Sequence, residues 1–209
     1  MIPVKVLAVR YLANAEKGLC DALGIPRGYS SLAMLTTDCD DATYIALDAA
    51  TKAAEVEVAF GRSFYAGAAN ASTPHAGEVM GILAARTPGA AGSGMEAALA
   101  ALERLGFEEI NGVPYLAHTV SSVGSFLAKE AGIPRGTALA YLIAPPLEGM
   151  YALDGALKAA DVALCKLYAP PTETNFGGGL LTGTQSACQA ACAAFAAAVA
   201  EAAQRPIEQ

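Results

Sequence analysis

The feature that most constrains this chain is an internal repeat. The pentapeptide Gly-Ile-Pro-Arg-Gly stands at residues 24–28 and again at 132–136, an offset of 108 residues. Ala-Leu-Asp at 46–48 recurs at 152–154, and each copy is followed by Lys-Ala-Ala. The second offset is 106 residues, so a whole domain is duplicated and not a short motif. Each copy is too long for a solenoid unit and is expected to own a hydrophobic core.

The repeat predicts two domains, residues 1–110 and 111–209. Helical periodicity gives way between them to the turn residues Asn111 and Gly112. Hydrophobic residues make up 54% of the chain and charged residues only 16%. That composition is apolar for two small cores, so we expect part of the surface to lie in subunit contacts.

The patterning predicts the same order of elements in both copies, which indicates two α+β (α/β) domains, each a small sheet with packed helices. In the first copy we expect strands near 3–10, 31–37, 55–65 and 77–85, and helices near 14–23, 40–54 and 89–105. In the second copy we expect strands near 114–121, 138–144, 161–169 and 178–183, and helices near 123–131, 146–160 and 185–203.

Several function classes are disfavoured. The net charge is −7 and the basic residues are scattered, which argues against nucleic-acid binding. The most apolar run, from Ala187 to Ala203, is mostly alanine and contains Gln189 and Glu201, so no membrane span is expected. The N-terminus enters a strand pattern without a signal sequence, which predicts a cytosolic protein.

Motifs for cofactor, metal and catalytic chemistry are weak. Residues 86–91 separate the Gly-x-Gly-x-x-Ala pattern at residues 92–97 from the strand before it, and the next strand does not end in an acidic ribose ligand, so we expect no nucleotide cofactor. His75 and His118 are not spaced as a metal pair, and the five cysteines form no Cys-x-x-Cys. No convergent base, nucleophile or metal set is visible, and the chain is predicted not to be an enzyme.

Carboxylates are the remaining candidates for chemistry. Asp38, Asp40 and Asp41 follow a predicted strand, and Glu78 lies at the start of another. They could form a pocket for a small cation. Alternatively, the aspartates complement the macrodipole at the start of the following helix. The residues themselves leave both interpretations open.

Two glycine-bearing loops, residues 66–74 and 170–179, connect the same pair of strands in the two copies. Both contain few apolar side chains and cannot be held by a core of their own. They are either exposed hairpin connections or functional loops. Residues 177–179 are three consecutive glycines, which we expect to act as a hinge.

Residues 32–37 followed by 45–58, with their repeat at 139–164, resemble the signature of bacterial microcompartment shell domains. In that family the signature opens the domain, whereas here a strand and helix precede each copy. The arrangement therefore resembles two tandem, circularly permuted shell domains. The whole chain is similar to the L-type shell proteins of ethanolamine-utilisation microcompartments.

The resemblance implies a homotrimer that mimics a hexamer and lies in a microcompartment shell beside other shell proteins. It also implies a gated central pore for metabolites, bounded by the two loops. The implied pore residues are Gly67, Asn70, Thr73, Thr174, Asn175, Phe176, Gly177 and Gly178.

The same resemblance assigns two further sets of residues. Lys52 and Lys158 match the lysine by which shell domains meet laterally. The alternative is an ordinary exposed charge, which is less attractive because the lysine recurs at the same helical position in both copies. Asp40, Asp41, Glu78 and Phe107 match a small-pore site for ethanolamine, where carboxylates and an aromatic wall suit an ammonium group. The alternative function is a trimeric module that binds or senses a small ammonium metabolite.

Overall fold

The computed structural model describes residues 1–64 and 78–207. Its contacts divide the chain into two units. The N-terminal unit contains Pro3–Leu105 and also Gly124–Leu127. The C-terminal unit contains Met1–Ile2, Gly106–Val123 and Ala128–Gln209. The change of unit after Leu105 comes a few residues before the predicted boundary, and two short segments are exchanged between the copies.

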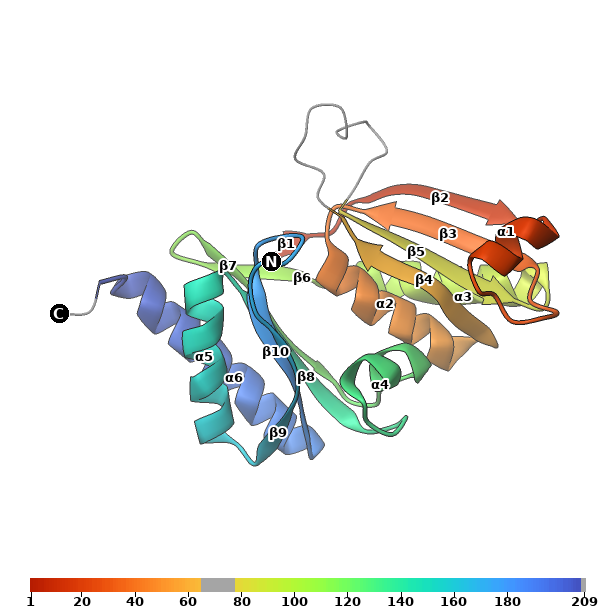
Figure 1. The fold of residues 1–209 in the computed structure, drawn as a ribbon. Coiled ribbons are helices and arrows are strands. Elements are labelled where there is room, and N and C mark those ends of the chain that lie inside the picture. Colours follow the sequence, from red (N-terminus) through yellow and green to blue (C-terminus); the bar gives the residue numbers. More distant parts are fainter. Residues whose placement is uncertain (65–77, 208–209) are drawn as a thin grey trace. The chain divides into compact units, whose positions relative to one another are not determined.

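The N-terminal unit is built on a four-stranded antiparallel sheet in the order β2-β3-β5-β4 (Figure 1). The strands are β2 (Val6–Leu12), β3 (Ser31–Thr37), β4 (Val56–Ser63) and β5 (Val79–Ala85). The helices are α1 (Lys17–Ala22), α2 (Asp40–Ala53) and α3 (Pro88–Leu102).

Both long helices of this unit cover one face of the sheet (Figure 1). Leu47 of α2 lies so close to Gly81 of β5 that a side chain there would collide with it. Gly94 of α3 lies in the same way against Val56 and Leu83. Small residues therefore let the helices approach the strands closely. On the other face Ala15 and Ile25 pack with residues of β3 and β5.

The C-terminal unit repeats this sheet as β7-β8-β10-β9 and extends it beyond β7 with β6 and β1. Its strands are β1 (Ile2–Pro3), β6 (Gly106–Ile110), β7 (Val113–Val120), β8 (Ala138–Ala144), β9 (Val162–Tyr168) and β10 (Gly177–Gly183). Its helices are α5 (Pro146–Ala159) and α6 (Gln185–Gln204), and α4 (Ser125–Ala131) begins in residues of the N-terminal unit.

The predicted element order is confirmed in both copies within the described residues. Strands β1 and β6 were not predicted. Asn111 and Gly112, beside the predicted boundary, form a two-residue hairpin loop between β6 and β7, in which both residues have positive φ, 50° and 80°. Asn-Gly favours this turn, because both residues tolerate the left-handed region. An Asn-Gly turn is a sequence signal for a hairpin, so it also indicates the strand β6 that precedes it.

Helix α6 is the one described helix whose length and composition would allow it to cross a membrane. Its apolar side instead packs on the strands and on α5 in the core of the C-terminal unit, as the buried side chains Cys188, Cys192, Phe195 and Val199 show. These are the contacts of a core helix, which passes the same compositional test.

Candidate functional site

Three predicted ligand-binding residues belong to the N-terminal unit. Asp40 and Asp41 form the first turn of α2, and Glu78 directly precedes β5. The Glu78 N–H donates to the carbonyl of Thr37, the last residue of β3, at 2.8 Å. This bond places the start of β5 beside the connection from β3 to α2. We call Asp40, Asp41 and Glu78 the acidic cluster.

Hydrogen bonds fix the carboxylate of Asp40. Ser63 Oγ donates to Asp40 Oδ2 at 2.7 Å, and the N–H of Asp41 donates to Asp40 Oδ1 at 2.9 Å. The hydroxyl of Tyr44 is hydrogen-bonded to the same Ser63 Oγ. Both aspartates are buried. The network aligns Asp40 with the N-terminus of α2, where a negative charge is favourable.

The electrostatics of the cluster favour a cation. Burial raises the pKa of Glu78, and the negative charges of Asp40 and Asp38 raise it further. Burial also raises the pKa of Tyr44 to about 12, and it raises the pKa of Cys39 above its ordinary value. A positive charge would relieve the repulsion between these carboxylates. In the described part of the chain, no three His, Cys, Asp or Glu side chains form a metal site.

The fourth predicted ligand residue, Phe107, belongs to β6 of the C-terminal unit. Its ring meets that of Phe176 edge to face, with 5.5 Å between the ring centroids. The structure therefore unites the three carboxylates in one unit and pairs Phe107 with a residue of the second loop.

The second loop is ordered by its own hydrogen bonds. Between β9 and β10, the Thr172 hydroxyl donates to the Phe176 carbonyl at 2.7 Å, and the Asn175 N–H donates to the Thr172 carbonyl at 3.2 Å. Asn175 has φ of 59°, a conformation that asparagine tolerates better than most residues. Thr174 lies in the same turn. The first loop, with Gly67, Asn70 and Thr73, lies outside the described residues.

The predicted hinge glycines are not loop residues. Gly177, Gly178 and Gly179 are the first residues of β10, and they pair with Ala144, Ile143 and Leu142 of β8. Gly178 has φ of 149°, and a Cβ there would lie 2.0 Å from the Leu142 carbonyl oxygen. These glycines allow close pairing of strands, so the expected hinge is corrected: the sheet holds them in place.

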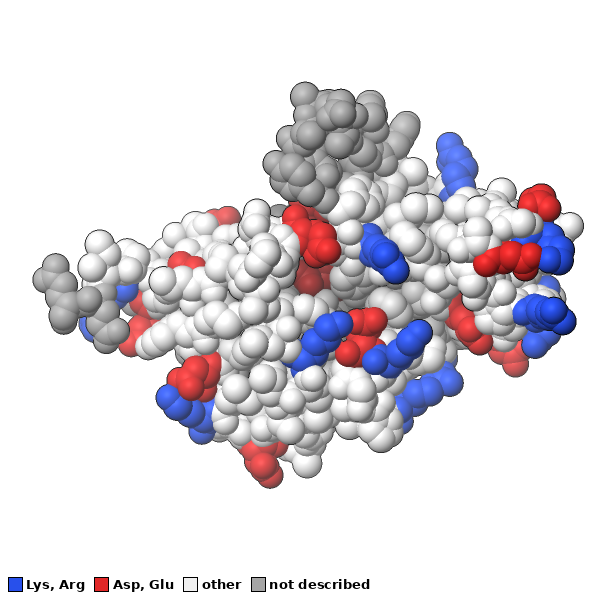
Figure 2. All heavy atoms as spheres, in the orientation of Figure 1, with Lys and Arg blue, Asp and Glu red and all other residues white. Residues whose placement is uncertain are grey.

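The two repeated lysines differ in their surroundings. Lys52 Nζ lies 3.3 Å from the carboxylate of Asp48, which is completely buried. Lys158 Nζ lies 2.6 Å from Asp154, whose side chain is 62% exposed. Figure 2 shows Lys and Arg as separate groups on the face in view, several of them beside acidic residues. Lys52 thus supports a buried carboxylate, while Lys158 belongs to a surface pair.

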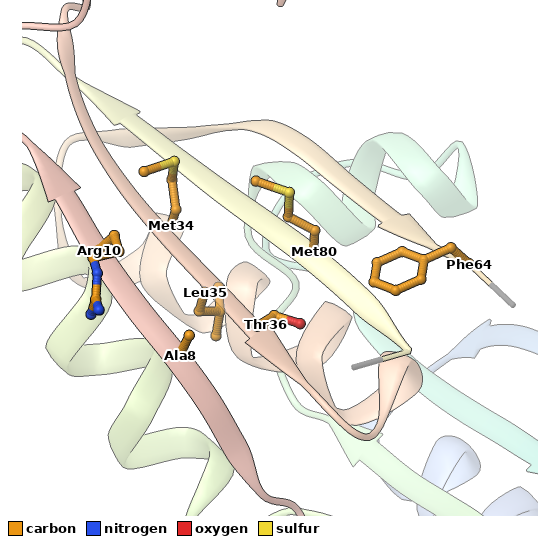
Figure 3. Close-up of a pocket in the computed structure, with 7 residues that line it drawn as sticks. All are labelled: Ala8, Arg10, Met34, Leu35, Thr36, Phe64 and Met80. Atoms are coloured by element: carbon orange, nitrogen blue, oxygen red, sulfur yellow. The ribbon is translucent and has the colours of Figure 1, made fainter. Parts of the chain in front are cut away.

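A pocket of about 300 Å³ lies on the sheet of the N-terminal unit (Figure 3). Sequence reasoning missed it, because ordinary strand residues from separate parts of the chain form it. The Thr36 hydroxyl is buried there, without a hydrogen-bond partner in the described part of the chain. The lining residues are Ala8, Arg10, Met34, Leu35, Thr36, Phe64 and Met80.

Comparison with known proteins decides what this architecture is. No protein-family model matches the chain. The chain is 54% identical over 211 residues to the bacterial microcompartment shell protein EutL of Clostridium perfringens, covering 99% of this chain and 97% of that protein. The chain belongs to the EutL family of bacterial microcompartment shell proteins.

Solved structures agree with this membership. The ethanolamine utilization protein EutL of Leptotrichia buccalis superposes with a TM-score of 0.95 at 55% identity, covering all of this chain and 98% of that one. The microcompartment shell protein PduB, which is described as trimeric, shares the fold at 19% identity, with a TM-score of 0.80 and coverage of 96% and 89%.

Membership in the EutL family confirms the predicted family, the tandem shell-domain fold and the location in a microcompartment shell. It also confirms a structural, non-enzymatic role. The family therefore decides against an enzyme that would use the acidic cluster as catalytic carboxylates.

Proposed function

We propose that the chain forms a pseudo-hexameric homotrimer that lies in the shell of an ethanolamine-type microcompartment, beside other shell proteins. The full-length similarity to EutL carries this proposal. The duplicated sheet supports it, since three two-domain chains supply six similar units around an axis. Exposed apolar side chains such as Leu147, Leu164 and Leu167 are the kind of surface that subunit contacts bury.

In this trimer, the loop after β4 and the loop of residues 170–176 surround a central pore for metabolites. The hydrogen bonds within the second loop support one ordered arrangement for it. Because Gly177 and Gly178 are held in β10, any gating of this loop has to come from residues 170–176, which include Thr174, Asn175 and Phe176. The first loop contributes Gly67, Asn70 and Thr73.

The shell assignment predicts a trimer that tiles into sheets. Sedimentation should give three times the 21.1 kDa mass of one chain, and electron microscopy should show flat sheets. Lys158→Ala should keep the trimer and abolish the sheets, because it removes an exposed cation from the proposed lateral edge. Lys52 is a poorer target, since it also neutralises the buried Asp48.

The matched control is Lys129→Ala, which removes a lysine that the repeat does not duplicate, from the last turn of α4. It should leave both trimer and sheets intact. A monomeric wild-type protein at micromolar concentration would contradict the trimer. If Lys158→Ala forms normal sheets, the lateral role of this lysine is wrong, while the proposed trimer is unaffected.

We further propose that the acidic cluster binds a small ammonium compound, ethanolamine being the first candidate. Buried Asp40 and Asp41 and the perturbed Glu78 support a site that prefers positive charge. Calorimetric titration should show binding that weakens with salt and is at least about tenfold weaker in Glu78→Gln or Asp41→Asn, because a charge-assisted contact is lost.

Binding should also depend on pH. Since the pKa of Glu78 is raised, this carboxyl takes up a proton above the pH at which an ordinary glutamate does, and affinity should fall as pH decreases through that range. Glu78→Gln should bind weakly with a flatter pH profile. Asp154→Asn, which alters an exposed carboxylate elsewhere, is the control. Equal affinity for ethylene glycol and ethanolamine would contradict a charge-based site.

A further inference from the structure

A short segment of the second copy is built into the first. By its contacts, Gly124–Leu127 belongs to the N-terminal unit. The N–H groups of Gly124 and Leu127 donate to the two carboxylate oxygens of Asp48 on α2, at 2.7 and 2.9 Å. Leu127 is 1% exposed. The segment thus caps α4 with a carboxylate from another helix and buries its leucine.

The ring of Phe126 occupies the place where a side chain would stand on β4. A Cβ built on Gly61 would lie 3.2 Å from the Phe126 ring. The same ring lies beside Tyr44 of α2, with 5.9 Å between the ring centroids. A large residue of the docked segment therefore fits over a glycine of the strand. We call this arrangement the Phe126–Gly61 contact.

The repeat identifies the equivalent residues of the other copy. The Gly-Ile-Pro-Arg-Gly offset of 108 residues places Gly18 at the position of Phe126 and Leu19 at that of Leu127. Gly61 of β4 pairs with Gly81, and Leu167 of β9 pairs with Gly179 at the same place in the repeated sheet. The pairing of β4 with β5 and the pairing of β9 with β10 each contain one register shift just before these residues. Gly61 and Leu167 therefore remain equivalent beyond the irregularity.

The sizes of the two residues are exchanged between the copies. In the contact within the chain, Phe126 of the segment lies over Gly61 of the strand. The equivalent residues of the other copy are Gly18 on the segment and Leu167 on the strand. Within the chain, Leu167 is 49% exposed and Leu19 is 44% exposed. The residue equivalent to Leu167 is Gly61, which lies under the Phe126 ring. The residue equivalent to Leu19 is Leu127, which is buried. Leu19 on the segment and Leu167 on the strand are thus both exposed, and Gly18 leaves room for a side chain between them. The two surfaces are therefore complementary in size.

We propose that the first turn of α1 in one chain docks on β9 and α5 of a second copy, as Gly124–Leu127 docks on β4 and α2, with Leu167 filling the space over Gly18. This inference rests on the proposed trimer, and it names the contact that joins its chains. The occupant is a second copy, because the docking pattern already exists inside the chain with the sizes reversed.

The two contacts differ at the helix cap. A Cβ on Gly124 would lie 2.2 Å from Thr51 Oγ1, so that position accepts only glycine. The equivalent residue is Glu16, which caps its own helix by accepting from the N–H groups of Gly18 and Leu19. Asp154 is therefore not needed as a cap. In the proposed contact, the larger Glu16 keeps α1 farther from α5 than Gly124 keeps α4 from α2, and the longer Leu167 spans the wider gap.

A size exchange tests the proposal. Gly18→Phe places a ring against Leu167, and Leu167→Gly opens a hole there. Each should raise the concentration at which half the chains are trimeric by about tenfold or more. The double variant Gly18→Phe/Leu167→Gly recreates the Phe126–Gly61 contact between chains, and it should return within about threefold of wild type because the residues are coupled. Sedimentation over a dilution series measures all four proteins.

Gly89→Ala is the control, since Gly89 lies on α3, outside the proposed contact, and a Cβ there meets no atom within 4 Å. It should leave association unchanged. Circular dichroism checks that each variant is folded. Additive weakening in the double variant, about a hundredfold, would overturn the contact while leaving the trimer in place. So would wild-type association in both single variants. A monomeric wild-type chain would instead overturn the proposed function itself.

Discussion

Gly178→Ala is expected to destabilise the C-terminal unit severely. Gly178 of β10 pairs with Ile143 on one side and Tyr168 on the other, and it has φ of 149°, a conformation that alanine rarely adopts. The added Cβ would also lie 2.0 Å from the carbonyl oxygen of Leu142. Backbone strain and this clash together should lower the free energy of unfolding by about 3 kcal/mol or more.

Urea unfolding followed by circular dichroism gives the measurement, with all variants at one protein concentration because association contributes to stability. Gly89→Ala is the matched control. Gly89 lies in the first turn of α3 with open space around its Cβ position, so alanine should be neutral or slightly stabilising. A wild-type midpoint for Gly178→Ala would return residues 177–179 to the loop and restore the hinge interpretation.

Asp48→Ala is expected to have a comparable effect on the N-terminal unit. The completely buried carboxylate accepts from the N–H groups of Gly124 and Leu127 and pairs with Lys52. Alanine would leave two backbone donors without their acceptor and would remove the carboxylate from its pair with Lys52. We expect a loss of about 3 kcal/mol, because breaking one side of a buried charged network exposes the cost of desolvating the other.

The repeat supplies the control for this prediction. Asp154 occupies the same position beside the same lysine, but its pair with Lys158 is exposed. Asp154→Ala should therefore cost about 0.5 kcal/mol or less, as surface ion pairs usually do. Similar unfolding midpoints for the two alanine variants would contradict the structural role assigned to Asp48.

The candidate site was predictable only in part. The sequence names Asp40, Asp41 and Glu78, and the bond from Glu78 to Thr37 places Glu78 beside the connection that leads into the two aspartates. Their role as a ligand site, like the lateral role of Lys52 and Lys158, stays a prediction. The pocket beside Thr36 could not be predicted from the sequence, because strand pairing assembles it from residues far apart in the chain.

The sequence by itself determined the duplication, the order of the repeated elements and the shell-domain family. Those features are carried by local periodicity and by motifs that recur at a fixed offset, and neither depends on distant contacts. The residues at Gly177 and Gly178 show where that reasoning ends. Three glycines look like a hinge in the sequence, but only the neighbouring strand decides whether their small size serves motion or close packing.

The tertiary structure decided which of two identical motifs is buried. Ala-Leu-Asp followed by Lys-Ala-Ala occurs twice, yet the side chain of Asp48 is 0% exposed and that of Asp154 is 62% exposed. The difference comes from Gly124–Leu127, a segment more than seventy residues away in the chain, in which the N–H groups of Gly124 and Leu127 donate to the carboxylate of Asp48. Burial depends on what covers a helix after folding, and local sequence does not contain that information.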